Sequence, residues 1–95
     1  MVVGLGHVTL RIEGCRSLKE KRRVVKTVVH RLRNEFNVSA AEVGANDIYQ
    51  RAEIGVAAVG NDREQINSKI DKLFNFVEDM GLAEVIDTQM EILNI

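Results

Sequence analysis

Four segments of the chain alternate apolar and polar residues with a period of two, which predicts β-strands that each bury one face. These segments cover about residues 2–12, 37–43, 50–59 and 84–93. In the first strand, the apolar face consists of Val8, Leu10 and Ile12. In the last strand, we expect the inward face to consist of Ile86, Met90 and Ile92.

Two other segments repeat apolar residues every three or four positions, which predicts amphipathic helices. The first begins at residue 18, because Ser17 and Glu20 have the spacing of a capping box, and runs to about residue 35. Its inner face consists of Leu18, Val25, Val28, Val29, Leu32 and Phe36. The second lies between a turn at residues 60–62 and Gly81, which suits a helix C-terminus because glycine tolerates positive φ. Its apolar residues are Ile66, Ile70, Leu73, Val77 and Met80.

The order of these elements is βαββαβ, and right-handed crossovers then give an α+β, ferredoxin-like fold. We expect residues 1–95 to form a single domain, a two-layer sandwich in which two helices cover one face of a four-stranded antiparallel sheet. The apolar residues expected on the open face, among charged ones, are Val3, Leu5, Ala57, Val59, Val85 and Leu93. A partly apolar open face is typical of a dimerisation surface, which makes the protein a candidate homodimer.

The net charge of −1 conceals two oppositely charged halves of the chain. Residues 1–36 hold nine Lys and Arg against three Glu, a balance of +6. Residues 37–95 hold four Lys and Arg against eleven Asp and Glu, a balance of −7. This asymmetry fits either steering toward an anionic partner or attraction between elements of the same domain.

Much of the positive charge forms a stripe along the first helix. Intervals of four, three, four and three residues put these side chains on one face, with Arg22 at its edge: Lys19, Arg23, Lys26, His30 and Arg33. One interpretation is a surface that contacts RNA phosphates, with Lys19, Arg22, Arg23, Lys26 and Arg33 as the candidate RNA-binding residues. The other interpretation is a solvated helix face beside the core. Since the strand at 50–57 lacks stacking aromatic residues, RNA would be recognised by shape and phosphate contacts.

A second candidate site is the connection at residues 46–51, because functional residues often collect on such loops. Here the candidate contact residues are Asp47, Tyr49 and Arg51. The structural alternative is an Asx-type turn at Asn46 and Asp47, with Tyr49 covering the end of the core.

The remaining residues indicate no catalytic or metal chemistry. Cys15 is the only cysteine, so no intramolecular disulfide can form and a reduced, cytoplasmic setting fits best. His7 and His30 have no partners at metal-ligand spacing, and no acid–base pair or nucleophile constellation is visible. We therefore expect no enzyme activity, metal or cofactor. No apolar run approaches the roughly 20 residues of a membrane span, so we expect no membrane association.

Several short motifs together resemble one known family. They are Ser17–Arg22, Phe36–Ser39, Ala41–Val43, Asp47, Gln50–Ala52, Gly55–Ala57 and Asn61–Asp62. In these motifs, and over nearly its whole length, the chain resembles the YlxP-like family of small bacterial proteins of unknown function. The resemblance implies a ferredoxin-like fold. The genes of that family often lie beside genes for translation initiation and ribosome maturation.

The resemblance implies by analogy a non-enzymatic accessory factor in translation or ribosome maturation, which contacts ribosomal RNA or a ribosomal particle. The chain departs from the family pattern at Glu13, where a proline is common, and at Tyr49, where a tryptophan is often seen. No catalytic residue is implied. The alternative from another class is a homodimeric protein-interaction or small-ligand-sensing module that uses the open sheet face.

Overall fold

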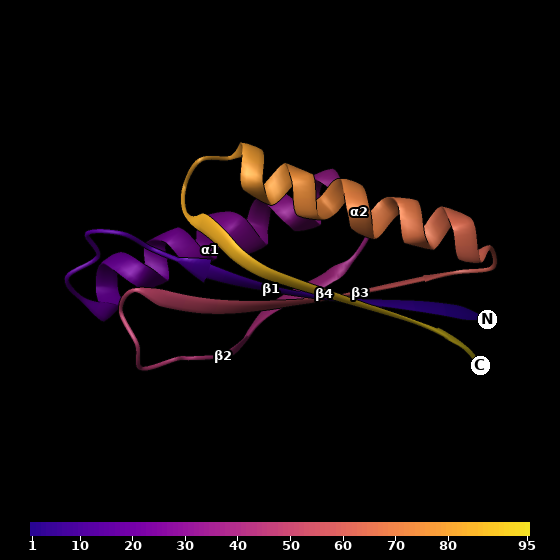
Figure 1. Ribbon diagram of the computed structural model, residues 1–95, viewed down its shortest axis with the longest axis horizontal. Coiled ribbons are helices and arrows are strands. Elements are labelled where there is room, and N and C mark those ends of the chain that lie inside the picture. The colour runs from indigo at the N-terminus through magenta and orange to yellow at the C-terminus, as the bar shows by residue number, and fades with distance from the viewer.

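The strands and helices follow one another in the predicted order. The computed structural model describes residues 1–95. Its elements are β1 (Val2–Arg11), α1 (Leu18–Glu35), β2 (Ser39–Gly44), β3 (Arg51–Gly60), α2 (Arg63–Asp79) and β4 (Glu84–Asn94). The sheet order is β2-β3-β1-β4, and each neighbouring pair of strands is antiparallel. This is the ferredoxin-like arrangement, so the predicted α+β fold class is confirmed (Figure 1).

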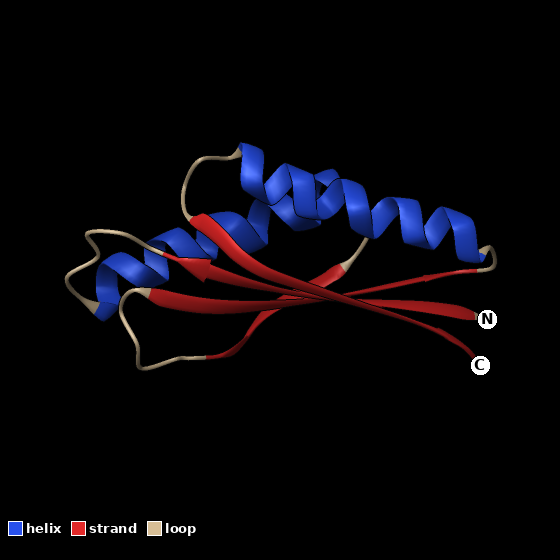
Figure 2. Ribbon diagram, in the orientation of Figure 1, coloured by secondary structure: helices blue, strands red, loops and turns tan.

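Both helices lie on one face of the sheet, and the opposite face carries no helix (Figure 2). The molecule is elongated, with extents of 42 × 22 × 20 Å. The β1–α1 and β2–β3 connections lie at one end of it, and both chain termini lie at the other (Figure 1). Neither helix is both long enough and apolar enough to cross a bilayer.

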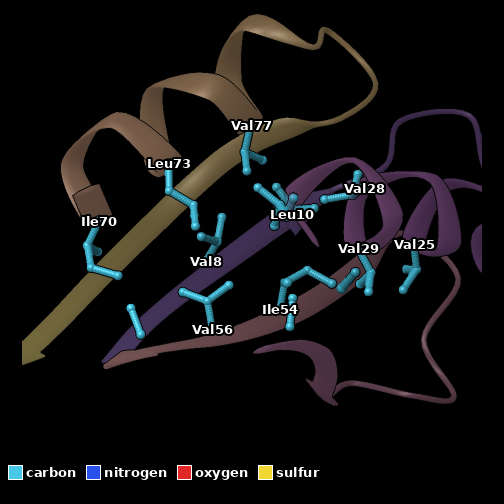
Figure 3. Packing of buried hydrophobic residues seen from close by; sticks show 14 of the residues in the cluster. Val8, Leu10, Val25, Val28, Val29, Ile54, Val56, Ile70, Leu73 and Val77 are labelled. Atoms are coloured by element: carbon cyan, nitrogen blue, oxygen red, sulfur yellow. The ribbon is translucent and has the colours of Figure 1, made fainter. Parts of the chain in front are cut away.

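The core lies between the helices and the covered face of the sheet. β1 and β3 contribute Val8, Leu10, Ile54 and Val56, all buried. Both helices turn their predicted apolar faces toward these residues (Figure 3). Full burial of such a side chain contributes about 1.5–3 kcal/mol. The apolar faces therefore determine how α1 and α2 lie on the sheet.

The first turn of α1 is capped much as the sequence predicts. The Ser17 Oγ accepts a hydrogen bond from the backbone N–H of Glu20 at 3.1 Å. The Glu20 carboxylate reaches one residue further back than a capping box requires and accepts from the N–H of Arg16 at 2.9 Å. At α2, the side chain of Asp62 accepts from two backbone N–H groups of the first turn, and Gly81 follows the helix with φ 67°.

The predicted phase of β4 is wrong at its first residues. We expected Ile86 to face the core and Val85 to lie on the open face. A β-bulge opposite Leu10 inserts one extra residue into β4, so Val85 pairs with Leu10 and packs against the core, while Ile86 is 46 % exposed. Met90 and Ile92 lie beyond the bulge and pack against the core as predicted.

Each edge strand of the sheet has a carbonyl group that accepts a hydrogen bond from an arginine of the helical layer. At β2, the Arg33 Nη2 donates to the Ala40 carbonyl at 2.6 Å. At β4, the Arg63 Nη1 donates to the Ile92 carbonyl at 3.3 Å. Unpaired edges are templates for aggregation, and charged side chains placed on them oppose it. The two arginines therefore protect both edges of the sheet.

Candidate nucleic-acid interface

The predicted row of basic residues is exposed along α1. We call its members the basic stripe: Lys19, Arg22, Arg23, Lys26, His30 and Arg33. No ion pair of the structure includes any of them. The positive charges of the five Lys and Arg side chains are therefore not compensated within the chain.

The stripe lies on the flank of α1 that overlooks the edge strand β2, since Arg33 reaches Ala40 of that strand. The other flank faces α2, where the guanidinium carbon of Arg31 lies 5.5 Å from the ring centroid of Phe76. From Lys19 to Arg33 the stripe extends about 21 Å, with a cation roughly once per helical turn. A linear row of this kind suits contact with successive phosphates of one nucleic-acid backbone.

Arg33 differs from the other Lys and Arg residues of the stripe, because its guanidinium already donates to the Ala40 carbonyl. Its remaining N–H groups can still bind an anion. A ligand that pulls the side chain away must break a hydrogen bond worth about 1 kcal/mol. Arg33 thus has a structural role at the edge of β2 that its place in the stripe did not indicate.

Lys21 belongs to the same run of basic residues but is buried. It is 1 % exposed, and its Nζ donates to the Ala45 carbonyl and lies 3.0 Å from the Glu42 Oε2. That oxygen accepts no hydrogen bond, so its contact with Lys21 is an ion pair outside hydrogen-bond geometry. Lys21 therefore attaches the first turns of α1 to the end of β2 and to the loop that follows.

The β2–β3 loop is held beside the N-terminal end of α1 at both of its ends. Lys21 binds Ala45 at the start of the loop. At its end, the Gln50 Nε2 donates to the Cys15 carbonyl at 3.4 Å, and the Gln50 carbonyl accepts from the N–H of Ile12 at 2.8 Å. The loop and the start of α1 therefore share one end of the molecule, as Figure 1 shows.

The three candidate contact residues are all exposed: Asp47 and Tyr49 in the loop, and Arg51 at the first position of β3. The interpretation in which Tyr49 covers the end of the core is wrong, because Tyr49 is 45 % exposed and lies outside the core cluster. The turn is closed by the backbone N–H of Ile48, which donates to the Ala45 carbonyl, and not by an Asx side chain. Arg51 keeps only a loose pairing, with its Nε 3.9 Å from the Glu53 Oε2.

The structure thus brings the loop and the basic stripe together only at the N-terminal end of α1. The loop lies next to the part of the stripe that contains Lys19 and Arg22, whereas Arg33 lies at the far end of α1. Sequence reasoning missed the side chain that makes this juxtaposition, Lys21. A signal was present, because Lys21 precedes Val25 by four residues and Val28 by seven, the spacing of the apolar face.

The open face of the sheet is hollowed near its middle. The hollow has a volume of about 820 Å³, and small or apolar side chains line much of it, among them Leu5, Ala41, Val43, Gly55 and Ala57. His7 also lines the hollow, and its Nε2 lies 3.1 Å from the Glu53 Oε1, a contact that the sequence did not indicate. No group of three or more His, Cys, Asp or Glu side chains is placed to hold a metal ion.

Comparison with known proteins identifies a family that the chain matches. Residues 3–90 match the family described as "Protein of unknown function (DUF503)". The chain is 34 % identical over 90 residues to "Uncharacterized protein YlxP" of Bacillus subtilis (strain 168), a match that covers 95 % of this chain and 98 % of that protein.

Solved structures share the fold at low sequence identity. A de novo designed protein with ferredoxin fold, LFR1 1, matches with a TM-score of 0.56 and 13 % identity, over 100 % of this chain and 87 % of that one. An antibiotic biosynthesis monooxygenase matches with a TM-score of 0.55 and 10 % identity, over 100 % of this chain and 98 % of that one. At such identities the likeness concerns the fold alone.

Proposed function

This chain belongs to the YlxP-like family of proteins of unknown function, DUF503, and we propose that it is a non-enzymatic accessory factor in translation or ribosome maturation that binds RNA through the basic stripe. The observation that carries the proposal is the exposed row of uncompensated charges along α1. The expected partner is ribosomal RNA or a ribosomal particle.

The stripe is unfavourable for the helix that carries it. Lys19 and Arg22 lie near the positive end of the helix macrodipole. The pairs Lys19/Arg23 and Arg22/Lys26 place like charges four residues apart, and each costs about 0.2–0.5 kcal/mol. No carboxylate of the chain forms an ion pair with them. An RNA backbone would supply the missing negative charges.

The loop adds a contact of a different kind at the N-terminal end of the stripe. The exposed ring of Tyr49 can stack on an unpaired base, a contact worth about 1–3 kcal/mol. Asp47 can accept a hydrogen bond from a base amino group, and Arg51 can reach a phosphate. In this proposal the stripe supplies affinity, and the loop selects an unpaired nucleotide beside the bound backbone.

The test compares two double charge reversals that change the net charge equally. Arg23→Glu/Lys26→Glu alters the stripe, and Lys69→Glu/Lys72→Glu alters α2 near Phe36 at the C-terminal end of α1. We expect the stripe variant to lose co-sedimentation with ribosomal subunits and to bind a ribosomal RNA fragment at least about tenfold more weakly. The α2 variant should bind like the unaltered protein.

Circular dichroism of both variants verifies that they are folded before binding is compared. Unchanged binding by the stripe variant would show that α1 does not contact RNA. Equal losses in the two variants would show that binding depends on overall charge and has no fixed surface. Either result contradicts the proposal.

A further inference from the structure

The β2–β3 loop begins with a residue in a left-handed backbone conformation. Ala45 has φ 57° and is the only residue other than glycine with a positive φ. This conformation is unfavourable for a residue with a Cβ atom, so it persists only where the surrounding contacts impose it. A β-bulge precedes it, because the pairing of β2 with β3 shifts between Glu42 and Gly44, where the ladder ends. Strand pairing therefore does not hold the chain at Ala45.

Two hydrogen bonds to the Ala45 carbonyl favour this conformation. One comes from the N–H of Ile48 at 3.1 Å and closes the turn within the loop. The other comes from the buried Nζ of Lys21, which also lies 3.0 Å from the Glu42 Oε2. Lys21 thus contacts the chain on both sides of the bulge and joins it to α1. Without this ammonium group, the turn would keep only its internal hydrogen bond.

The turn determines where Tyr49 lies. Tyr49 follows Ile48 directly, and its exposed ring is outside the core cluster, so packing does not fix it. At the end of the loop, Gln50 is hydrogen-bonded to the β1–α1 connection. The position of Tyr49 relative to the basic stripe is therefore determined by Lys21 on one side and by Gln50 on the other.

We propose that Lys21 is a positioning residue, which fixes the loop to α1 so that Tyr49 and the basic stripe contact one RNA at a set separation. This inference rests on the proposed function and names the class of RNA that the site binds. Contacts at a fixed separation favour an RNA whose phosphates and unpaired base are also fixed, because less ordering is needed on binding. Such an RNA is a duplex with a bulged nucleotide, whose base can stack on an aromatic ring.

The first measurement is made on the free protein. Lys21→Met/Glu42→Leu, which we call the buried-pair variant, removes both charges of the buried pair and keeps the net charge, so the fold should persist. The matched control, Lys72→Met/Glu78→Leu, removes one charge of each sign from exposed positions of α2. We expect NMR order parameters of amides 46–49 of about 0.85 in the unaltered protein and the control, and below about 0.6 in the buried-pair variant. If circular dichroism shows that this variant is unfolded, Lys21→Gln/Glu42→Gln replaces it.

The second measurement compares two RNA hairpins that differ only by a bulged adenosine. We expect the unaltered protein and the control to bind the bulged hairpin at least about tenfold more tightly. The buried-pair variant should lose most of this preference and still bind the other hairpin within about threefold of the unaltered protein, because the stripe is intact. Tyr49→Ala should lose the same preference, and its addition to the buried-pair variant should change nothing further. If Lys21 had only a general structural role, the two losses would be additive.

The outcomes distinguish this inference from the proposed function. Loop amides that stay ordered in the buried-pair variant, or that are mobile in the unaltered protein, would overturn the inference even if RNA binds. Additive losses, or equal binding of both hairpins by the unaltered protein, would also overturn it and leave RNA binding by the stripe intact. If neither hairpin binds, the proposed function fails together with the RNA class, and the order parameters alone decide whether Lys21 positions the loop.

Discussion

Lys21 lies in a run of basic residues, yet its ammonium group is enclosed between α1, Glu42 and the Ala45 carbonyl. An ammonium group taken out of water loses several kcal/mol of hydration, which its partners must offset. Removal of one member of such a buried pair therefore costs far more than the pair contributes to stability. At the residue scale, Lys21 is the charged side chain on which the arrangement of α1 and the loop depends.

Lys21→Ala should lower the free energy of unfolding by about 2–4 kcal/mol, because it leaves Glu42 unpaired and the Ala45 carbonyl without its donor. Urea denaturation followed by circular dichroism measures the change. Lys72→Ala, at an exposed position of α2, should stay within about 0.5 kcal/mol of the unaltered protein. Similar small changes in both variants would contradict a structural role for Lys21.

The burial of Lys21 shows what local patterns can and cannot predict. Its spacing to Val25 and Val28 places it on the inner face of α1, but a lysine at such a position usually extends to solvent. What retains it inside is Glu42 and Ala45, which are more than twenty residues away in the chain. No spacing within the helix indicates that these groups meet it.

At the element scale, the sequence pattern predicted all six elements to within about two residues, because each has a strong apolar period and clear end signals. The exception lies inside β4. Val85 and Ile86 are both apolar, so either can be the inward residue and the period does not choose between them. The bulge opposite Leu10 makes Val85 the inward residue. This bulge depends on how β4 pairs with β1, which the pattern within β4 does not show.

Deletion of Ile86 should be tolerated, because it removes the extra residue of the bulge and leaves Val85 and Asp87 opposite Leu10 and Thr9. We expect a loss of no more than about 1 kcal/mol in the free energy of unfolding. Deletion of Gln89 is the matched control. It shifts the register by one residue and turns Asp87 toward the helices, so it should cost several kcal/mol. Thermal denaturation compares the two, and equal losses would argue against this account of the bulge.

At the scale of the whole molecule, the charge asymmetry has two separable parts. Arg11 pairs with Glu84 at 3.2 Å and Lys21 pairs with Glu42, so some positive charge of the first half is matched by the second half. The basic stripe has no such match. Composition could not separate these parts, because the pairing depends on which strands and helices the fold places side by side.

Binding to RNA should therefore depend steeply on salt. If the five Lys and Arg residues of the stripe each neutralise one phosphate, the logarithm of the binding constant should fall against the logarithm of salt concentration with a slope of about −3.5 to −4.5. Arg23→Glu/Lys26→Glu should make this slope shallower by about 2. Fluorescence anisotropy between about 50 and 200 mM KCl measures both slopes. A constant that does not change with salt would exclude the stripe as the contact surface.

The burial of Lys21 also has a consequence for chemical reactivity. The chain has five lysines, and reagents that acylate amines need access to the nitrogen: Lys19, Lys21, Lys26, Lys69 and Lys72. In the folded protein the amine of Lys21 is shielded, so it acquires a label only while the start of α1 is detached from the sheet. The labelling rate of the Lys21 amine therefore reports how often the start of α1 detaches from the sheet. Bound RNA that stabilises this end of the molecule would lower that labelling rate.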